Sequence, residues 1–314
     1  MIYVFLLSGL ILLVAGGEVL VRGAVSIAQT FKVSPLVIGL TLVGFGTSTP
    51  ELVTSLQAAF AGAPGIAVGN VVGSNIANIL FILGLSALIF PVAVASSSFR
   101  RDGLVLSAAT LLCVGVIFLG ALTRWMGVVL VAGLIAYIAY AFLKERSPAT
   151  ANAAELPDES SKPNSLLLNA VFVVAGLVMT IFGARFLVMS ATDIATSFGV
   201  SETIIGLTIV AVGTSLPELV TSLMAALRKQ GDLAFGNIVG SNIYNILGIL
   251  GVTAIVKPIP IPPQIASFDV WVLLGATLLL IIAAITHWKV TRLEGGIMLA
   301  GYVAYIAMLV GFAV

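Results

Sequence analysis

The sequence predicts an all-α polytopic membrane protein, with ten transmembrane helices arranged as two inverted five-helix repeats and with broken helices at the membrane midplane. Three observations predict this fold class: the composition, the recurrence of long apolar runs, and an internal repeat. Of the 314 residues, 60% are hydrophobic and 9% are charged, whereas soluble domains carry about 25% charged residues. The mean hydropathy of +1.20 therefore excludes a soluble globular chain.

Apolar runs of about 20 residues, the length that crosses a bilayer, recur along the whole chain. No Lys or Arg precedes the first run, so we expect a transmembrane helix there and not a signal peptide. A polar, proline-containing segment, 144–165, separates the two halves, 1–143 and 166–314, and we expect it to be a loop. The expected spans are 2–21, 34–61, 65–92, 103–121, 126–143, 166–187, 203–227, 233–256, 268–286 and 295–313.

The basic residues between these spans are unevenly distributed over the two sides of the membrane. Basic loops stay in the cytoplasm. We therefore expect a multi-pass protein of the cell's inner (plasma) membrane, with both termini outside and the central loop cytoplasmic. The larger set, expected in the cytoplasm, is Arg22, Lys32, Arg100, Arg101, Lys144, Arg146, Lys162, Arg228, Lys229, Lys289 and Arg292. The smaller set, expected outside, is Arg124, Arg185 and Lys257.

The second half of the chain repeats the first. Segments 39–80 and 206–247 align at an offset of 167 residues, with 27 identities in 42 positions and no gap. Each half has an odd number of expected spans, so the second half crosses the membrane in the opposite direction. Inverted repeats with interrupted helices predict a secondary transporter whose site lies near the midplane.

The motif GTSTPE, at residues 46–51, places a proline and a carboxylate in the middle of an apolar run. Glu51 is the one charged residue between Pro35 and Pro64. A proline cannot donate a backbone hydrogen bond, so we expect two half-helices with a break at 46–48. A break frees carbonyl oxygens, and such oxygens beside a carboxylate are typical of a hard-cation site. The second copy, GTSLPE, predicts the same arrangement around Glu218.

A purely structural alternative explains the same residues. Ser48-x-x-Glu51 and Ser215-x-x-Glu218 both fit the capping box of a helix N-terminus. A cap contributes about 1 kcal/mol, whereas an ionised carboxylate at the middle of the bilayer costs at least a few kcal/mol. The cost exceeds the benefit, so a ligand that uses the charge is expected, and capping can coexist with it.

The second repeated motif reads GNVVGSNIAN in the first half and GNIVGSNIYN in the second. Ser74 and Asn78 are four residues apart and share a helix face, as do Ser241 and Asn245. Hydrogen bonding between helices is the structural alternative for these side chains. Together with the two glutamates they form a set of oxygen donors without His or Cys, which suits Ca²⁺, Na⁺ or Mg²⁺ but not zinc or copper.

Several other functions receive no support. His287 and Cys113 are the single histidine and the single cysteine, so neither a histidine metal site nor an internal disulfide is expected. The net charge of +1 gives no reason to expect a nucleic-acid partner. No nucleophile and base stand together in the spans, so the chain is not expected to be an enzyme. No cofactor and no obligate protein partner are implied; membrane lipid and the transported ions are the expected partners.

The paired motifs GTS-x-PE and GN-x-VGSN-x-x-N resemble the α-repeats of the calcium:cation antiporter superfamily, and within it the prokaryotic sodium/calcium exchangers. The resemblance covers nearly the whole chain and implies an antiporter that exchanges Na⁺ for Ca²⁺ by alternating access and extrudes Ca²⁺. It implies that Glu51 and Glu218 bind both ions, with the carbonyls of Thr47 and Thr214 completing the calcium site. The remaining implied residues are the sodium ligands Ser48, Ser74, Ser215, Ser241 and the carbonyls of Gly44 and Ala211, with Asn78 and Asn245 beside the glutamates.

The chain departs from part of the superfamily in two places. Potassium-dependent exchangers carry an aspartate where this chain has Asn245, so potassium dependence is not expected. The central segment is too short for the calcium-sensing domain of animal exchangers. The alternatives are a proton-coupled antiporter for Ca²⁺ or another divalent cation, whose superfamily members carry a GN-x-x-E type motif, and a cation channel.

Overall fold

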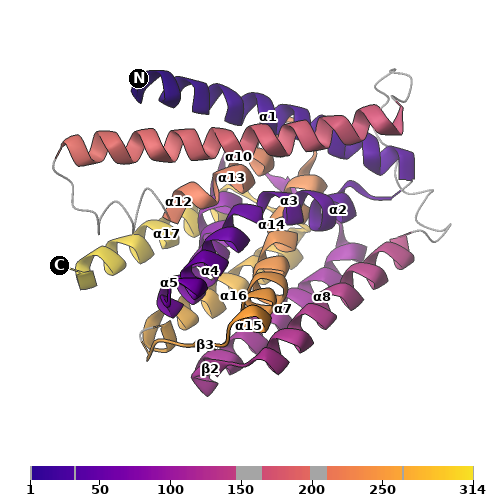
Figure 1. Cartoon of the computed structure of the whole chain (residues 1–314). Coiled ribbons are helices and arrows are strands. Elements are labelled where there is room, and N and C mark those ends of the chain that lie inside the picture. The colour runs from indigo at the N-terminus through magenta and orange to yellow at the C-terminus, as the bar shows by residue number, and fades with distance from the viewer. Residues whose placement is uncertain (1, 32, 146–164, 199–210, 264, 314) are drawn as a thin grey trace.

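A computed structural model of the chain describes residues 2–31, 33–145, 165–198, 211–263 and 265–313. These residues form an all-helical fold with two very short strand pairs (Figure 1). Within these described ranges, eight helices are long and apolar enough to cross a membrane, and one bent helix pair adds a ninth. The chain is therefore a polytopic membrane protein, as the composition predicts.

The first and sixth expected spans are much longer than the sequence suggested. Helices α1 (Ile2–Phe31) and α10 (Leu166–Ser197) lie side by side across one face of the molecule (Figure 1). The predicted ends at 21 and 187 are wrong. Helix α1 continues where α10 still covers it, with Gly23 lying against Val173. At 1.5 Å per residue each helix is about 45–48 Å long, so it must tilt or project beyond a hydrocarbon core of about 30 Å.

Glycines allow α1 and α10 to touch. A Cβ added at Gly9 would lie 2.9 Å from the carbonyl oxygen of Gly183, and one added at Gly16 would lie 3.0 Å from that of Gly176. Gly9 and Gly176 are 167 positions apart, as are Gly16 and Gly183. Gly9 therefore lies against the residue that corresponds to Gly16, and Gly16 lies against the residue that corresponds to Gly9. Here, two residues 167 positions apart are called equivalent.

The rest of the first half begins with a helix that is interrupted and bent by 43°. It consists of α2 (Pro35–Ile38), the π-helix η1 (Gly39–Val43), α3 (Gly44–Thr47) and α4 (Thr49–Phe60). The next span is continuous and is formed by α5 (Pro64–Ile76), the π-helix η2 (Ala77–Leu83) and α6 (Gly84–Ile89). Helices α7 (Ser96–Leu119) and α8 (Arg124–Glu145) complete this half.

The second half follows the same order after α10. The described part of its interrupted helix is α12 (Ala211–Thr214) and α13 (Leu216–Leu227); the expected start of this span, 203–210, and the central segment 146–164 lie outside the described residues. The continuous span is α14 (Gly231–Ile243), the π-helix η4 (Tyr244–Leu250) and α15 (Gly251–Val256). The last elements are the π-helix η5 (Ile265–Asp269), α16 (Val270–His287) and α17 (Arg292–Ala313).

The helices that carry the GN-x-VGSN motif lie at the centre of the fold. The most apolar window of the α5–α6 span is 72% buried and that of the α14–α15 span is 89% buried, against 22–39% for the other six long spans. Lipid can cover the outer helices, but the two central spans are enclosed by protein. Polar side chains on them therefore have to find partners within the protein or bind a ligand.

Two short antiparallel ladders join the halves at the helix ends. Strand β1 (Val92–Ala93) pairs with β4 (Lys289–Val290), and β2 (Ala121–Leu122) pairs with β3 (Ile259–Pro260). Each ladder connects a loop of the first half to a loop of the second. The two halves are thus held together at two separate points outside the helices.

Candidate functional site

The break in the first interrupted helix is confined to a single residue. Ser48 has φ −83° and ψ 7°, and the helix resumes at Thr49. The expectation of an unwound 46–48 segment is therefore wrong for Gly46 and Thr47, which stay helical, because the Ser48 N–H still bonds to the carbonyl of Gly44 at 3.1 Å. Pro50 has no N–H to offer the carbonyl four residues before it, that of Gly46.

The second interrupted helix has the same local geometry. Ser215 has φ −90° and ψ 8° between α12 and α13, and Pro217 is the second residue of α13. The Leu219 N–H bonds to the Ser215 carbonyl at 3.0 Å, so the chain re-enters a helix at once. Ala211 begins α12, four residues before Ser215, as Gly44 stands before Ser48.

The two glutamates lie together, each in the first turn of its half-helix and each 1% exposed. A hydrogen bond from Ser48 Oγ reaches Glu218 Oε1 at 2.8 Å, and one from Ser215 Oγ reaches Glu51 Oε1 at 3.2 Å. Each serine thus binds the carboxylate of the opposite half. The positive end of each helix also favours negative charge at this place.

These bonds rule out the capping box as the explanation of the motif. Neither Ser48 nor Ser215 makes a side-chain cap bond to its own helix. A capping box requires the serine to bind the N–H three residues later, but both hydroxyls donate across to the other half instead. The physical reason is backbone geometry: an N-cap residue is extended, whereas ψ is 7° at Ser48 and 8° at Ser215.

Several buried oxygen atoms around the glutamates lack a partner among the described residues. They include Oε2 of Glu51, Oε2 of Glu218, Oδ1 of Asn78 and both side-chain polar atoms of Asn245. Buried polar atoms without partners are costly. A hard cation would satisfy the oxygens, so this donor set fits Na⁺ or Ca²⁺. In the described part of the chain no three His, Cys, Asp or Glu residues gather as a conventional metal centre would require.

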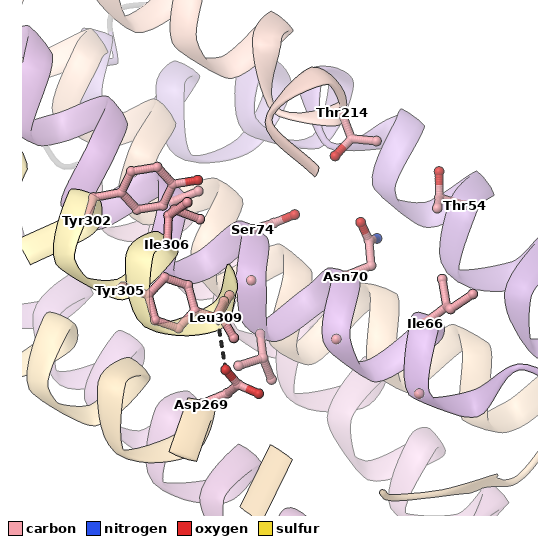
Figure 2. A pocket seen from close by; sticks show the side chains of 15 residues that line it. Thr54, Ile66, Asn70, Ser74, Thr214, Asp269, Tyr302, Tyr305, Ile306 and Leu309 are labelled. Carbon is pink, nitrogen blue, oxygen red and sulfur yellow. Dashed lines mark hydrogen bonds between the residues drawn. The ribbon is translucent and has the colours of Figure 1, made fainter. Parts of the chain in front are cut away.

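Other expected ligands lie next to this pair. Ser241 Oγ donates to the Gly44 carbonyl at 3.5 Å, which brings an expected residue of each half together. The Thr47 hydroxyl donates to the Val43 carbonyl at 3.1 Å and lies 3.4 Å from Asn237 Oδ1 of the other half. Ser74 and Thr214 line one cavity (Figure 2).

The sequence analysis missed two asparagines that hold the glutamates in place. Asn70 Nδ2 donates to the Glu51 carbonyl at 3.1 Å and to Ser55 Oγ at 2.9 Å. In the second half, Asn237 Nδ2 donates to the Glu218 carbonyl at 3.4 Å and to the Ser222 hydroxyl at 2.9 Å. All of these residues are equivalent pairs within the repeat, and that duplication was the signal that could have identified them.

A π-helix changes the face on which Asn78 and Asn245 lie. Helices η2 and η4 begin at the equivalent residues Ala77 and Tyr244, immediately before the asparagines. A π-helix bonds i to i+5, so its wider turn rotates the following residues relative to an α-helix. The expectation that Ser74 and Asn78 share one α-helical face is therefore only approximate. Such π segments frequently occur at functional sites.

A cavity of about 380 Å³ leads to the site from one end of α5. Its wall runs from Ile66, which is 60% exposed, to Ser74 and Thr214 beside the glutamates (Figure 2). Other lining residues include Asn70, Asp269 and the tyrosines Tyr302 and Tyr305. The two carboxylates do not line this cavity, but Asn70, which donates to the Glu51 carbonyl, does.

The equivalent face of α14 is packed and not open. A Cβ added at Gly236 would lie 2.4 Å from the Leu36 carbonyl oxygen, and one added at Gly240 would lie 2.5 Å from Leu40 Cα. At Gly69 and Gly73 of α5, no described atom lies within 4 Å of an added Cβ. The α14 glycines thus allow the first interrupted helix to approach closely. The positions equivalent to Leu36 and Leu40 are 203 and 207, which lie outside the described residues.

Comparison with known proteins places the chain in a family. The family model described as sodium/calcium exchanger protein matches residues 1–143 and 168–311. The chain is 33% identical over 346 residues to sodium/calcium exchanger MaX1 of Methanosarcina acetivorans, with 98% of each chain covered. It is 37% identical over 316 residues to inner membrane protein YrbG of Escherichia coli (strain K12), with 97% of this chain and 95% of that one covered.

A solved structure has the same fold. The sodium-calcium exchanger NCX_Mj, soaked with zero Na⁺ and Ca²⁺, superimposes with a TM-score of 0.85 at 36% sequence identity over 98% of both chains. At this coverage the agreement includes the interrupted helices, which carry the two glutamates. The chain therefore belongs to the sodium/calcium exchanger family.

Proposed function

We propose that this protein is a secondary active antiporter that exchanges Na⁺ for Ca²⁺ across the membrane by alternating access and extrudes Ca²⁺. The observation that carries the proposal is the buried glutamate pair, each carboxylate bonded to a serine of the opposite half and each with one oxygen unpaired among the described residues. Membership of the sodium/calcium exchanger family supports the identity of the two ions. The ions are the transported substrates, and no cofactor takes part.

The proposed ligands combine this geometry with the set that the resemblance to the exchangers implies. Ca²⁺ neutralises both carboxylates at once, and several Na⁺ ions do so together with neutral oxygens. The occupied forms can cross the barrier, whereas the empty dianion cannot, because its charge would be left uncompensated in a dry interior. The proposed set comprises Glu51, Glu218, Ser48, Ser215, Ser74, Ser241, Asn78, Asn245 and the carbonyls of Thr47, Thr214, Gly44 and Ala211.

The proposed architecture is two inverted five-helix repeats, 1–143 and 166–314, joined by the cytoplasmic segment 144–165. Reciprocal contacts support it. The equivalent residues Thr110 and Thr277 bond to one another at 3.4 Å, which is expected where a pseudo-two-fold axis passes. The family match omits residues 144–167, which favours the proposed boundary.

The proposed orientation places both termini outside and the central segment in the cytoplasm of the inner membrane. The strand ladders support the alternation of the loops. Ladder β1–β4 joins two loops that the basic residues assign to the cytoplasm, and β2–β3 joins two loops assigned to the outside. Arg228 also pairs with Glu18, at helix ends assigned to the same cytoplasmic side. Glu18 also forms an ion pair within its own helix, with Arg22 at 2.5 Å.

Calcium uptake into sodium-loaded proteoliposomes tests the proposal. With a sodium-free external buffer, uptake should require internal Na⁺, and Glu51→Gln should abolish it. Asp193→Asn, an exposed carboxylate on α10, is the matched control and should transport normally. Uptake that ignores Na⁺ but follows a pH gradient would identify a proton-coupled antiporter. Uptake that needs neither gradient would identify a channel.

A further inference from the structure

The cavity along α5 has one carboxylate in its described wall, Asp269. It lines the same cavity as Ser74 and Thr214 (Figure 2). The Tyr305 hydroxyl donates to Asp269 Oδ1 at 2.9 Å. Among the described residues no basic side chain forms an ion pair with Asp269, so its charge has no counter-ion within the described protein.

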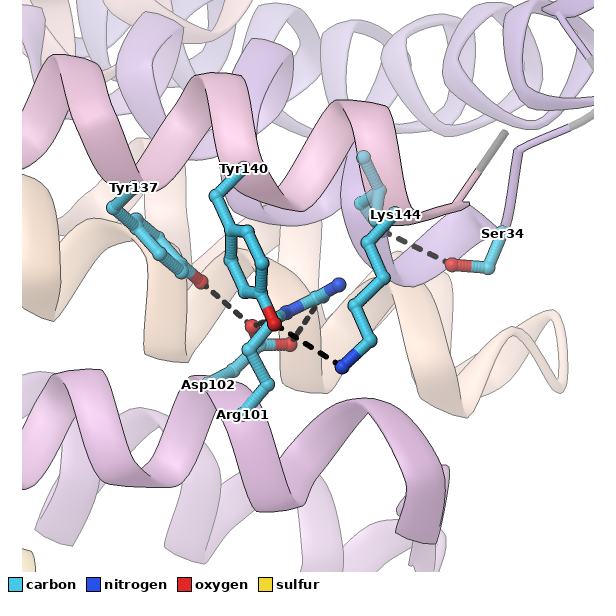
Figure 3. A network of polar contacts seen from close by, with 7 residues as sticks. Ser34, Arg101, Asp102, Tyr137, Tyr140 and Lys144 are labelled. Atoms are coloured by element: carbon cyan, nitrogen blue, oxygen red, sulfur yellow. Dashed lines mark hydrogen bonds and ion pairs between the residues drawn. The ribbon is translucent and has the colours of Figure 1, made fainter. Parts of the chain in front are cut away.

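The equivalent residue in the first half has the opposite environment. Asp102 is 1% exposed. Arg101 binds both of its oxygens, at 2.5 and 2.9 Å, and the Tyr137 hydroxyl donates to it at 2.9 Å (Figure 3). Residues around it, including Phe99 and Phe235, leave no space for a water molecule. The first half thus pairs and encloses its aspartate, whereas the equivalent Asp269 lines a cavity and has no basic partner among the described residues.

The aromatic wall fixes where the Asp269 charge lies. The ring of Tyr305 stacks on Phe268 with centroids 6.0 Å apart, and the ring of Tyr302 stacks on Phe81 at 5.2 Å. The Tyr305 hydroxyl is therefore held by a packed ring, and it holds the carboxylate in turn. A fixed negative charge beside low-dielectric walls focuses the electric field and raises the local concentration of cations.

From this contrast we propose that Asp269 is an entry subsite of the exchanger, whose carboxylate draws Na⁺ and Ca²⁺ into the cavity on their way to Glu51 and Glu218. This inference rests on the proposed function. Tyr305 is a positioning residue, because it acts through Asp269. The attraction scales with the charge of the ion, so the subsite concentrates Ca²⁺ more strongly than Na⁺.

The test uses right-side-out membrane vesicles, in which the proposed orientation places the cavity on the external face. Asp269→Asn should raise the half-saturating external Ca²⁺ concentration roughly 3- to 10-fold and leave the maximal rate unchanged. The half-saturating external Na⁺ concentration should also rise, by a factor of about the square root of the factor for Ca²⁺. Asp269→Glu should keep both half-saturating concentrations at their wild-type values, and Asp193→Asn should change neither.

Three results would overturn the proposal. Asp269→Asn could raise the half-saturating concentrations of Na⁺ and Ca²⁺ by equal factors, or it could lower the maximal rate without changing half-saturation. Asp269→Glu could also behave like Asp269→Asn. Tyr305→Phe gives a further check, since it removes the hydrogen bond and keeps the charge. If Tyr305→Phe reproduced the full Asp269→Asn effect, the bond and not the charge would matter. Wild-type vesicles without sodium-dependent uptake would refute the proposed function, and this inference would fall with it.

Discussion

Ser48 of the first half donates a hydrogen bond to Glu218 of the second, and Ser215 of the second half donates one to Glu51 of the first. The cation site therefore cannot form within either half alone. Any movement of one half against the other has to preserve or remake both bonds. The pair consequently couples the occupancy of the site to the arrangement of the two halves.

Ser48→Ala should weaken sodium binding and also destabilise the fold, because Ser48 donates to the buried Glu218 carboxylate. The substitution removes a hydrogen bond to a charged acceptor, a contribution of about 1.5–3 kcal/mol, so the half-saturating Na⁺ concentration should rise roughly 10-fold or more. The thermal unfolding midpoint should also fall, because the buried Glu218 Oε1 loses its donor. Transport kinetics and a thermal melt of the purified protein measure the two effects.

The chain supplies a control for this prediction. Thr291 and Glu294 form a true capping box at the start of α17, with the Thr291 N–H 2.7 Å from Glu294 Oε2 and the Glu294 N–H 3.3 Å from Thr291 Oγ1. Thr291→Ala should lower the midpoint by the loss of about 1 kcal/mol and leave sodium affinity unchanged. The account fails if Ser48→Ala behaves like Thr291→Ala.

The two supporting asparagines should differ in their effect on stability. Asn237 is 0% exposed, and its replacement by Ala would leave buried acceptors of Glu218 and Ser222 without a donor, at a cost of about 1–3 kcal/mol. Asn70 borders the cavity, where water can replace its bonds, so Asn70→Ala should cost less. Unfolding midpoints of the two variants in the same detergent measure the difference. Equal losses would contradict the asymmetry of access.

The glycines of α5 and α14 should tolerate substitution differently. An alanine at Gly236 would place its Cβ 2.4 Å from a backbone oxygen of Leu36, so Gly236→Ala should destabilise the protein by about 1–3 kcal/mol through overpacking. Gly69→Ala, at the equivalent position, should fold like the wild type. The yield of monodisperse protein and the unfolding midpoint report the outcome. Similar damage from both substitutions would refute the described packing.

Much of this fold followed from the sequence because it depends on local patterns. The proline at position 50 predicted a break, and the repeat predicted a second one around Ser215. The cross bonds between Ser48 and Glu218 did not follow, since they depend on how two distant segments meet. The same T/S-x-x-E pattern forms a capping box at Thr291 but not at Ser48, where a carboxylate of the other half is available as an acceptor.

The lengths of α1 and α10 were also beyond local reasoning. Arg22 suggested the end of a span at 21, but the helix continues to Phe31 because the small residues beyond it pack on α10. The roles of Asn70 and Asn237 were hidden for the same reason. Their partners lie 15 and 19 residues away in the chain, a separation that no helical periodicity relates.

The orientation can be tested with cysteines at corresponding positions of strands β2 and β4. In a Cys113→Ala background, Ala121→Cys should react with a membrane-impermeant maleimide in intact cells. Lys289→Cys should react only after the membrane is permeabilised, because its loop is assigned to the cytoplasm. Both side chains are exposed, so access and not burial decides the labelling. The reverse pattern would invert the proposed topology.

The central claim is that Glu51 and Glu218 form one site that Na⁺ and Ca²⁺ share. Equilibrium binding of radioactive Ca²⁺ to the purified protein tests it most directly, with titration of Na⁺ against the bound ion. The account predicts that one Ca²⁺ binds per chain, that Na⁺ displaces it, and that either Glu51→Gln or Glu218→Gln alone abolishes binding. Calcium binding that survives either single substitution, or that Na⁺ leaves undisturbed, would contradict a shared site.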